Sequence, residues 1–141
     1  MYKSILVPID LGETEAAQDA LKSAVEIATV SNGKLRLISV QQMLPATYMD
    51  YVPQDYDDKQ REWAKNEIAS IAKSLDIPQD RVTTTIRLGG TYPEILTEAE
   101  EWKADLIVIG SHRPAMSTYL LGSTAKSVVR HAKCSVLVVR S

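Results

Sequence analysis

Five short apolar runs rich in β-branched residues recur along the chain, and a stretch with helical periodicity separates each run from the next. The runs are Ser4–Ile9, Lys34–Val40, Val82–Leu88, Asp105–Ile109 and Ser135–Arg140. The segments ILVPI, LIVI and VLVV inside them are almost continuously apolar, which is typical of strands covered on both faces. This alternation predicts parallel strands that are joined by helical crossovers.

The intervening stretches carry apolar side chains at the spacing of amphipathic helices. Helices are predicted over Glu13–Val30, Asp57–Leu75, Thr91–Trp102 and Ser123–His131. The first is expected to end at Ser31-Asn32-Gly33, because Asn and Gly commonly follow a helix. The spacing of Thr91 and Glu94 is that of a capping box, which predicts a helix start at this point.

The order of these elements limits the topology, because right-handed crossovers leave few other arrangements. We predict an α/β fold with a single doubly wound five-stranded parallel sheet and helices on both faces, in one domain over residues 1–141. In such sheets ligands bind outside the carboxyl ends of the strands, where the winding direction reverses. The places to search are Ile9-Asp10, Val40-Gln41, Leu88-Gly89-Gly90 and Gly110-Ser111.

Gly122-Ser123-Thr124 stands where the last helix is expected to begin. The N-terminus of a helix offers unpaired N–H groups and a partial positive charge, so it can hold a phosphate group. Gly122 would let a phosphate approach the backbone, and both hydroxyl groups could donate hydrogen bonds. The alternative is that these residues only cap the helix. Gly110, at the end of a predicted buried strand, favours the phosphate site.

Asp10 ends the first predicted strand and has two possible roles. Its spacing to Glu13 is that of a capping box, so one role is to cap the next helix. The other is to accept a hydrogen bond from a ribose hydroxyl or an adenine amino group, or to help hold Mg²⁺ beside phosphates. The sequence leaves both roles open, and one side chain can serve both.

The loop after the fourth predicted strand carries His112 and Arg113. A guanidinium group suits phosphate recognition because it offers a fixed fork of donors, and a solvated loop charge is the alternative. No serine or cysteine nucleophile with an acidic orienting partner can be assigned, so His112 is not predicted to be a catalytic base.

Met43–Asp58 is a long connection that contains two prolines and three tyrosines. Connections of this length are often functional, so the segment would fold over a ligand or present tyrosines to a partner chain. The alternative is a disordered surface loop. Trp63 and Trp102 are interpreted as core or rim packing rather than as ligand platforms.

Composition and charge disfavour several classes of protein. A net charge of −2 argues against a nucleic-acid partner bound by bulk charge. No apolar run approaches the roughly 20 residues of a membrane helix, and MYKSILVPID is too short for a signal peptide. Cys134 is the only cysteine, which excludes an internal disulfide and makes the cytoplasm the expected location. The sequence has neither GxxxxGK[ST] nor GxGxxG, so neither a Walker-type ATPase nor an ordinary dinucleotide fold is predicted.

Three segments together resemble the universal stress protein family: ILVPID near the start, ADLIVIGSH at the fourth strand and LLGSTAKSVVRHAKCSVLVVR towards the end. The resemblance covers essentially the whole chain, and the GSHRP and STYLLGS segments are most similar to the F and G type of the family. It implies a universal stress protein domain over residues 1–141, with a Rossmann-like fold of the adenine nucleotide alpha hydrolase-like kind.

The resemblance also implies a nucleotide site. Nucleotide-binding members share a motif of Gly, two residues, Gly, nine residues and Gly-Ser/Thr. Gly110 and Gly122-Ser123 match its two ends, whereas Arg113 stands at the middle glycine and only eight residues separate it from Gly122. The resemblance implies that Pro8, Ile9 and Asp10 lie at the adenosine end of the nucleotide and that Val40 contacts the adenine. It implies that Gly110, His112 and Arg113 lie beside the ribose and phosphates. The phosphates themselves are expected at Gly122, Ser123 and Thr124.

Family members of this kind are often homodimers, so the resemblance implies a homodimer formed by the apolar last strand. The residues concerned are Val136, Leu137, Val138 and Val139. The expected function is an ATP-binding stress-response regulator that acts through an unknown protein partner, with ADP or AMP as competing ligands and Mg²⁺ beside the phosphates. Two alternatives remain: a nucleotide-free interaction dimer, and slow ATP hydrolysis or phosphotransfer, for which no general base can be assigned.

Overall fold

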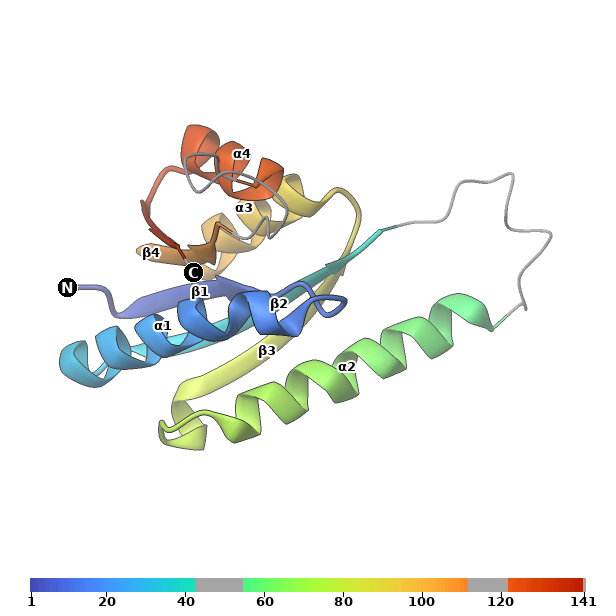
Figure 1. Cartoon of the computed structure of the whole chain (residues 1–141), viewed down its shortest axis with the longest axis horizontal. Coiled ribbons are helices and arrows are strands. Elements are labelled where there is room, and N and C mark those ends of the chain that lie inside the picture. The colour runs from blue at the N-terminus through green and yellow to red at the C-terminus, as the bar shows by residue number, and fades with distance from the viewer. Residues whose placement is uncertain (43–54, 112–121, 141) are drawn as a thin grey trace.

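The computed structural model describes residues 1–42, 55–111 and 122–140, and within them a five-stranded parallel sheet forms the centre of the molecule (Figure 1). Its strands are β1 (Ser4–Pro8), β2 (Lys34–Gln41), β3 (Val82–Leu88), β4 (Leu106–Gly110) and β5 (Ser135–Val139). Their order across the sheet is β3-β2-β1-β4-β5, and all four neighbouring pairs are parallel. The doubly wound sheet predicted from the sequence is confirmed, and the winding reverses between β1 and β4.

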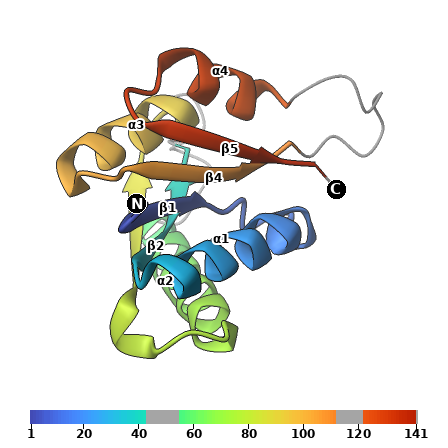
Figure 2. The ribbon, with the colours of Figure 1, turned by 90° about the vertical axis from the view of Figure 1, so that its left-hand side faces the viewer.

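The helices cover the sheet in two layers (Figure 2). The helices α1 (Gln18–Ser31) and α2 (Tyr56–Ser74) pack on one face, and α3 (Thr91–Trp102) and α4 (Ser123–His131) pack on the other. Two short 3-10 turns, η1 (Thr14–Ala17) and η3 (Gln79–Arg81), precede α1 and β3. No helix among the described residues is long and apolar enough to cross a bilayer.

The central strand β1 shows why its sequence is continuously apolar. Ile5 and Val7 belong to the core beneath α1 and α2, whereas Leu6 belongs to the core beneath α3 and α4. Side chains alternate between the faces of a strand, so a strand covered on both sides needs apolar residues at every position. β4 has the same pattern, with Val108 in one core and Ile107 in the other.

The VLVV run of β5 has this environment only in part. Val136 and Val138 pack against the core beneath α3 and α4, and Val139 packs against the core beneath α1 and α2, whereas Leu137 is 38% exposed. β5 is the last strand in the order of the described sheet, and its predicted cover on both faces is incomplete at Leu137.

Helix boundaries follow the predictions at most ends, with one correction at the start of α1. α1 ends at Ser31, where Asn32 adopts a left-handed conformation with φ 58° and the Gly33 N–H donates to the Ala28 carbonyl oxygen at 2.9 Å. The α-helical conformation, however, begins at Gln18 rather than Glu13, since η1 comes first.

Neither predicted capping box forms. Thr91 is the first residue of α3, Gly90 occupies the capping position, and no side chain caps this helix. Glu94 instead accepts a hydrogen bond from Arg87 Nε at 2.8 Å, because the end of β3 brings the guanidinium group beside the first turn of α3.

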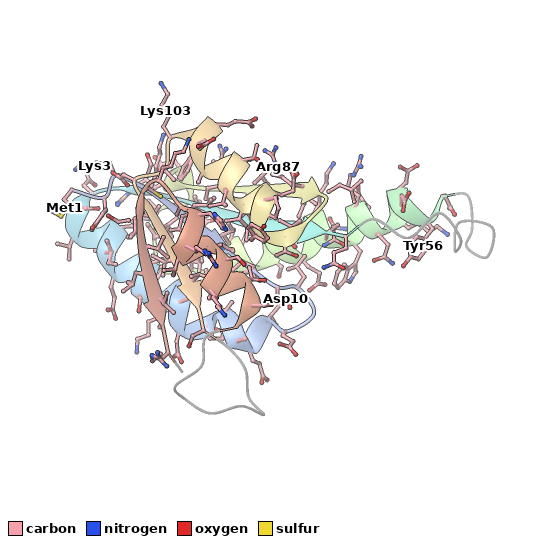
Figure 3. All side chains as sticks on the ribbon, turned by 90° about the horizontal axis from the view of Figure 1, so that it is seen from above. Met1, Lys3, Asp10, Tyr56, Arg87 and Lys103 are labelled. Atoms are coloured by element: carbon pink, nitrogen blue, oxygen red, sulfur yellow. The ribbon has the colours of Figure 1, made fainter. Side chains whose placement is uncertain are left out.

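A network of ion pairs fixes α3 to β2 and β3, and Figure 3 shows Arg87 beside this helix. Glu98, only 6% exposed, accepts hydrogen bonds at 2.8 Å from Arg36 Nη1 on β2 and from Arg87 Nη1 on β3. Arg87 also pairs with Glu101 at 3.2 Å. Hydrogen bonds from Arg87 to Glu94 and Glu98 raise the pKa of its guanidinium group, so this group stays charged at any physiological pH.

Candidate functional site

A cavity of about 710 Å³ opens at the carboxyl ends of β1, β2 and β4, where the winding of the sheet reverses. Its walls also include the turn that follows β1, the start of α3, the start of α4 and one side chain of α2. This volume lies within the range of roughly 300–1,000 Å³ that is typical of small-molecule sites.

The predicted binding residues that the structure describes all line this one cavity. They are Pro8, Ile9, Asp10, Val40, Gly110, Gly122, Ser123 and Thr124. The topology explains this gathering, because β2 and β4 flank β1 and all three strands run in the same direction. Residues from three separate parts of the chain therefore reach one edge of the sheet. His112 and Arg113 lie outside the described residues, as does residue range 43–54 of the long connection.

Asp10 follows β1 and is labelled in Figure 3 on the same side of the molecule as the start of α4. Its Oδ1 atom accepts a hydrogen bond from the Gly12 N–H at 2.9 Å, which fixes the turn after β1. Glu13 precedes η1 and makes no side-chain cap to that helix, so the predicted box of Asp10 and Glu13 is wrong. Asp10 orders its own turn and leaves its carboxylate at the cavity wall.

A resident metal centre does not fit the described residues. No group of three or more His, Cys, Asp or Glu side chains among them is placed to hold a metal ion. Asp10 offers a single carboxylate, which suits a Mg²⁺ ion only when phosphate oxygens and water supply its other ligands.

Gly110, the last residue of β4, has a packing role in addition to its place at the cavity. A Cβ atom on this residue would lie 3.0 Å from the carbonyl oxygen of Ala16, which comes from η1 on the neighbouring layer. Glycine therefore allows the turn after β1 to approach β4 closely, and this approach shapes the wall that the two elements share.

The first turn of α4 lies at the cavity, where Gly122, Ser123 and Thr124 line the wall, and the first N–H groups of a helix have no partner within it. Gly122 occupies the capping position, and neither hydroxyl group caps the helix because Ser123 and Thr124 are already helical. The capping alternative therefore holds for Gly122 alone, and it leaves the hydroxyl groups of Ser123 and Thr124 without a capping role. The helix start presents main-chain donors, two hydroxyl groups and a partial positive charge to one space, which is a suitable environment for an anion.

Trp63 on α2 also lines the cavity, which differs from the packing role expected from the sequence. Its side chain is 45% exposed, and the adjacent Ala64 is the residue that packs into the core. One signal was present in the sequence: Trp63 lies off the apolar stripe formed by Ala64, Ile68 and Leu75. Trp102, in contrast, packs at the other end of the sheet, where Arg36 stacks over its ring at 4.8 Å.

Cys134 lies just before β5, at the opposite edge of the sheet from the cavity, and is partly buried against the core beneath α3 and α4. Burial raises the pKa of its thiol, so the reactive thiolate form is scarce at neutral pH. Its environment is that of a packing residue.

Known proteins with similar sequences identify the family of this chain. The model of the family described as "Universal stress protein family" matches residues 1–140. Universal stress protein G of Shigella flexneri is 34% identical over 143 residues, a match that covers 99% of this chain and 100% of the relative. The same identity and coverage are found for universal stress protein G of Escherichia coli O157:H7.

Solved structures with the same fold include the universal stress protein UspA from Lactobacillus plantarum, which is 29% identical with a TM-score of 0.81 over 99% of this chain and 98% of that one. A universal stress protein in complex with cAMP is 25% identical, with a TM-score of 0.63 over 98% of this chain and 96% of that one.

Proposed function

This chain belongs to the universal stress protein family, and from that premise we propose that it is a stress-response regulator that binds ATP in the cavity at the carboxyl edge of its sheet. The observation that carries the proposal is the convergence of the start of α4 with the ends of β1, β2 and β4 on one cavity of suitable size. A similar protein has been solved with cAMP, another adenine nucleotide, which supports the choice of ligand class.

In this proposal the two ends of the nucleotide contact different kinds of protein groups. The phosphates lie at Gly122, Ser123 and Thr124, where main-chain N–H groups and hydroxyl groups donate hydrogen bonds. The adenosine lies towards Ile9 and Val40, whose side chains offer apolar contact.

Two further residues at the cavity complete the proposed contacts. The Asp10 carboxylate accepts a hydrogen bond from the ribose or the adenine amino group, or shares a Mg²⁺ ion with the phosphates. Gly110 leaves room for the sugar and phosphates at the end of β4. From the loop outside the described residues, His112 and Arg113 are proposed to lie beside the ribose and phosphates.

Titration of ATP into nucleotide-stripped protein is expected to give saturable heat of binding in a calorimeter. The same ligand at 100 times its Kd is expected to stabilise the fold by about 2.7 kcal/mol, because it binds only the folded state. A thermal melt with and without ATP measures this, and ADP and AMP titrated in parallel rank the three ligands. Absence of both heat and thermal shift at millimolar ATP would remove the proposal and favour a nucleotide-free interaction protein.

We also propose that the protein forms a homodimer through β5. β5 is the last strand in the order of the described sheet, and Val136, Leu137, Val138 and Val139 give it an apolar surface. Pairing with a second copy would cover this edge, which otherwise presents an aggregation hazard.

Replacement of Leu137 by lysine is expected to convert the dimer to a monomer, because the ammonium group would have to be buried in the interface without a partner. Light scattering coupled to size-exclusion chromatography measures the mass of each species. Val30→Lys is the matched control, since Val30 is 90% exposed and belongs to the end of α1 rather than to β5. A Leu137→Lys protein that keeps the mass of the unmodified dimer would contradict an interface at this strand.

A further inference from the structure

A half-exposed tryptophan stands at one end of the cavity, and the packing of the fold does not account for it. Trp63 belongs to the first half of α2, where the residues from Asp57 to Glu62 are all exposed. Ala64 and Ile68 supply the buried contacts of this helix, while Trp63 faces the cavity with 45% of its surface open. A large apolar surface left open at a pocket wall is a typical feature of a ligand contact.

Trp63 and the start of α4 lie at opposite ends of this cavity. α2 packs against β2 and β3, whereas α4 packs against β5 and α3. Within the sheet, β2 and β4 lie on either side of β1, so the ends of these two strands are about 10 Å apart at the usual strand spacing. A ligand whose phosphates occupy the α4 end therefore extends its other end towards β2 and Trp63.

The cavity has apolar walls on both sides of the sheet. Leu11, from the turn after β1, belongs to the same core as Ala64 of α2 and lines the cavity on that side. Ile38 and Val40 of β2 line it on the side of α3 and α4. An indole ring can cover the face of a nucleotide base, and such stacking is a sequence-tolerant source of affinity because every base has a π-face.

We infer that Trp63 stacks on the base of the bound nucleotide and makes the site selective for phosphate ligands that carry a flat aromatic base. The inference rests on the proposed function, because it assigns a residue to the base end of that same cavity. It also gives Trp63 the role of a specificity-determining residue: the start of α4 holds any polyphosphate, and Trp63 favours those with a base.

The two tryptophans of the chain allow a direct optical test. In Trp102→Phe protein only Trp63 emits, and ATP is expected to change its fluorescence with the same saturation curve that calorimetry gives. In Trp63→Phe protein only Trp102 emits, and ATP is expected to leave the signal unchanged, because Trp102 packs far from the cavity. If Trp102→Phe protein does not fold, the ATP-induced change in fluorescence of unmodified protein can be compared with that of Trp63→Phe protein instead.

Affinity provides the second readout. Trp63→Ala is expected to weaken ATP binding by about tenfold, while Trp63→Phe, which keeps an aromatic ring, recovers part of the loss. Inorganic tripolyphosphate, which has no base, is expected to bind the unmodified protein and both variants equally well. Val129→Ala is the control, since Val129 is exposed to the same degree, at 46%, on α4 and does not line the cavity.

The possible results distinguish failure of the stacking role of Trp63 from failure of ATP binding itself. Unchanged ATP affinity in Trp63→Ala, or an unchanged Trp63 signal at saturating ATP, overturns the stacking role and leaves the nucleotide site intact. Equal losses of ATP and tripolyphosphate would also overturn it, because Trp63 would then support the cavity as a whole. If unmodified protein does not bind ATP, whether or not it binds tripolyphosphate, the proposed function and this inference fail together.

Discussion

Replacement of Glu98 by alanine is expected to lower the free energy of unfolding by about 3 kcal/mol, although Glu98 carries a charge and lies on a helix at the surface layer. Its carboxylate is 8% exposed and bridges Arg36 on β2 to Arg87 on β3, with both nitrogen–oxygen distances at 2.8 Å. Removal of one partner leaves the other charges partly desolvated. About a quarter of each arginine side chain is exposed, which places the loss at the low end for buried ion pairs.

Glu101→Ala is the matched control for this result. Glu101 lies on the same helix and pairs with the same Arg87 at 3.2 Å, but its side chain is 65% exposed. Exposed ion pairs contribute less than about 1 kcal/mol, so this variant is expected to remain close to the unmodified protein. Urea denaturation measures the free energy of unfolding of both variants and of the unmodified protein. The comparison requires that all three have the same m-value. Equal losses for the two variants would mean that burial does not set the strength of this network.

Replacement of Ser123 by aspartate is expected to weaken ATP binding at least about 100-fold while the fold stays as stable as before or becomes slightly more stable. A carboxylate at the first residue of α4 favours the helix, because it complements the positive end of the helix dipole. The same carboxylate stands where the phosphates are proposed to lie. Repulsion between unit charges in contact reaches about 4 kcal/mol near a protein surface.

Calorimetry and a thermal melt on the same sample separate these two effects. Ser70→Asp is the control, because it makes the same substitution at an exposed position of α2 that does not line the cavity. Ser123→Ala removes only the hydroxyl group and is expected to lose a few-fold in affinity, the loss of one hydrogen bond. Ser123→Asp protein that binds ATP as tightly as unmodified protein would show that the phosphates do not lie at the start of α4.

The sheet and the place of the cavity could be predicted from the sequence because both follow from local patterns. Continuous apolar runs such as that of Ile5, Leu6 and Val7 require cover on both faces, and this requirement selects the doubly wound arrangement. Once the strands are parallel, their carboxyl ends must lie at one edge, so Asp10 and Gly110 come together despite their distance in sequence.

Glu98 and Trp63 could not be placed in the same way, since their environments depend on neighbours from other elements. A glutamate in a helix is typical of a solvated face, and Glu98 is buried only because Arg36 and Arg87 converge on it from two adjacent strands. The sequence places Trp63 off the apolar stripe of its helix, but only the packing of α2 against β2 and β3 shows that it lines the cavity. The position of β5 in the sheet could not be predicted either, because an apolar run does not reveal whether its strand is central or at an edge.

The two helical layers have a consequence for how the molecule would respond to a ligand. Each layer packs its own core, and the sheet separates the two cores along most of its length. At the cavity, however, Gly12 and Trp63 from one side share a wall with Ile95 and Thr124 from the other. A nucleotide bound there as proposed would contact elements of both helical layers, so its binding would be sensed on both faces of the sheet at once.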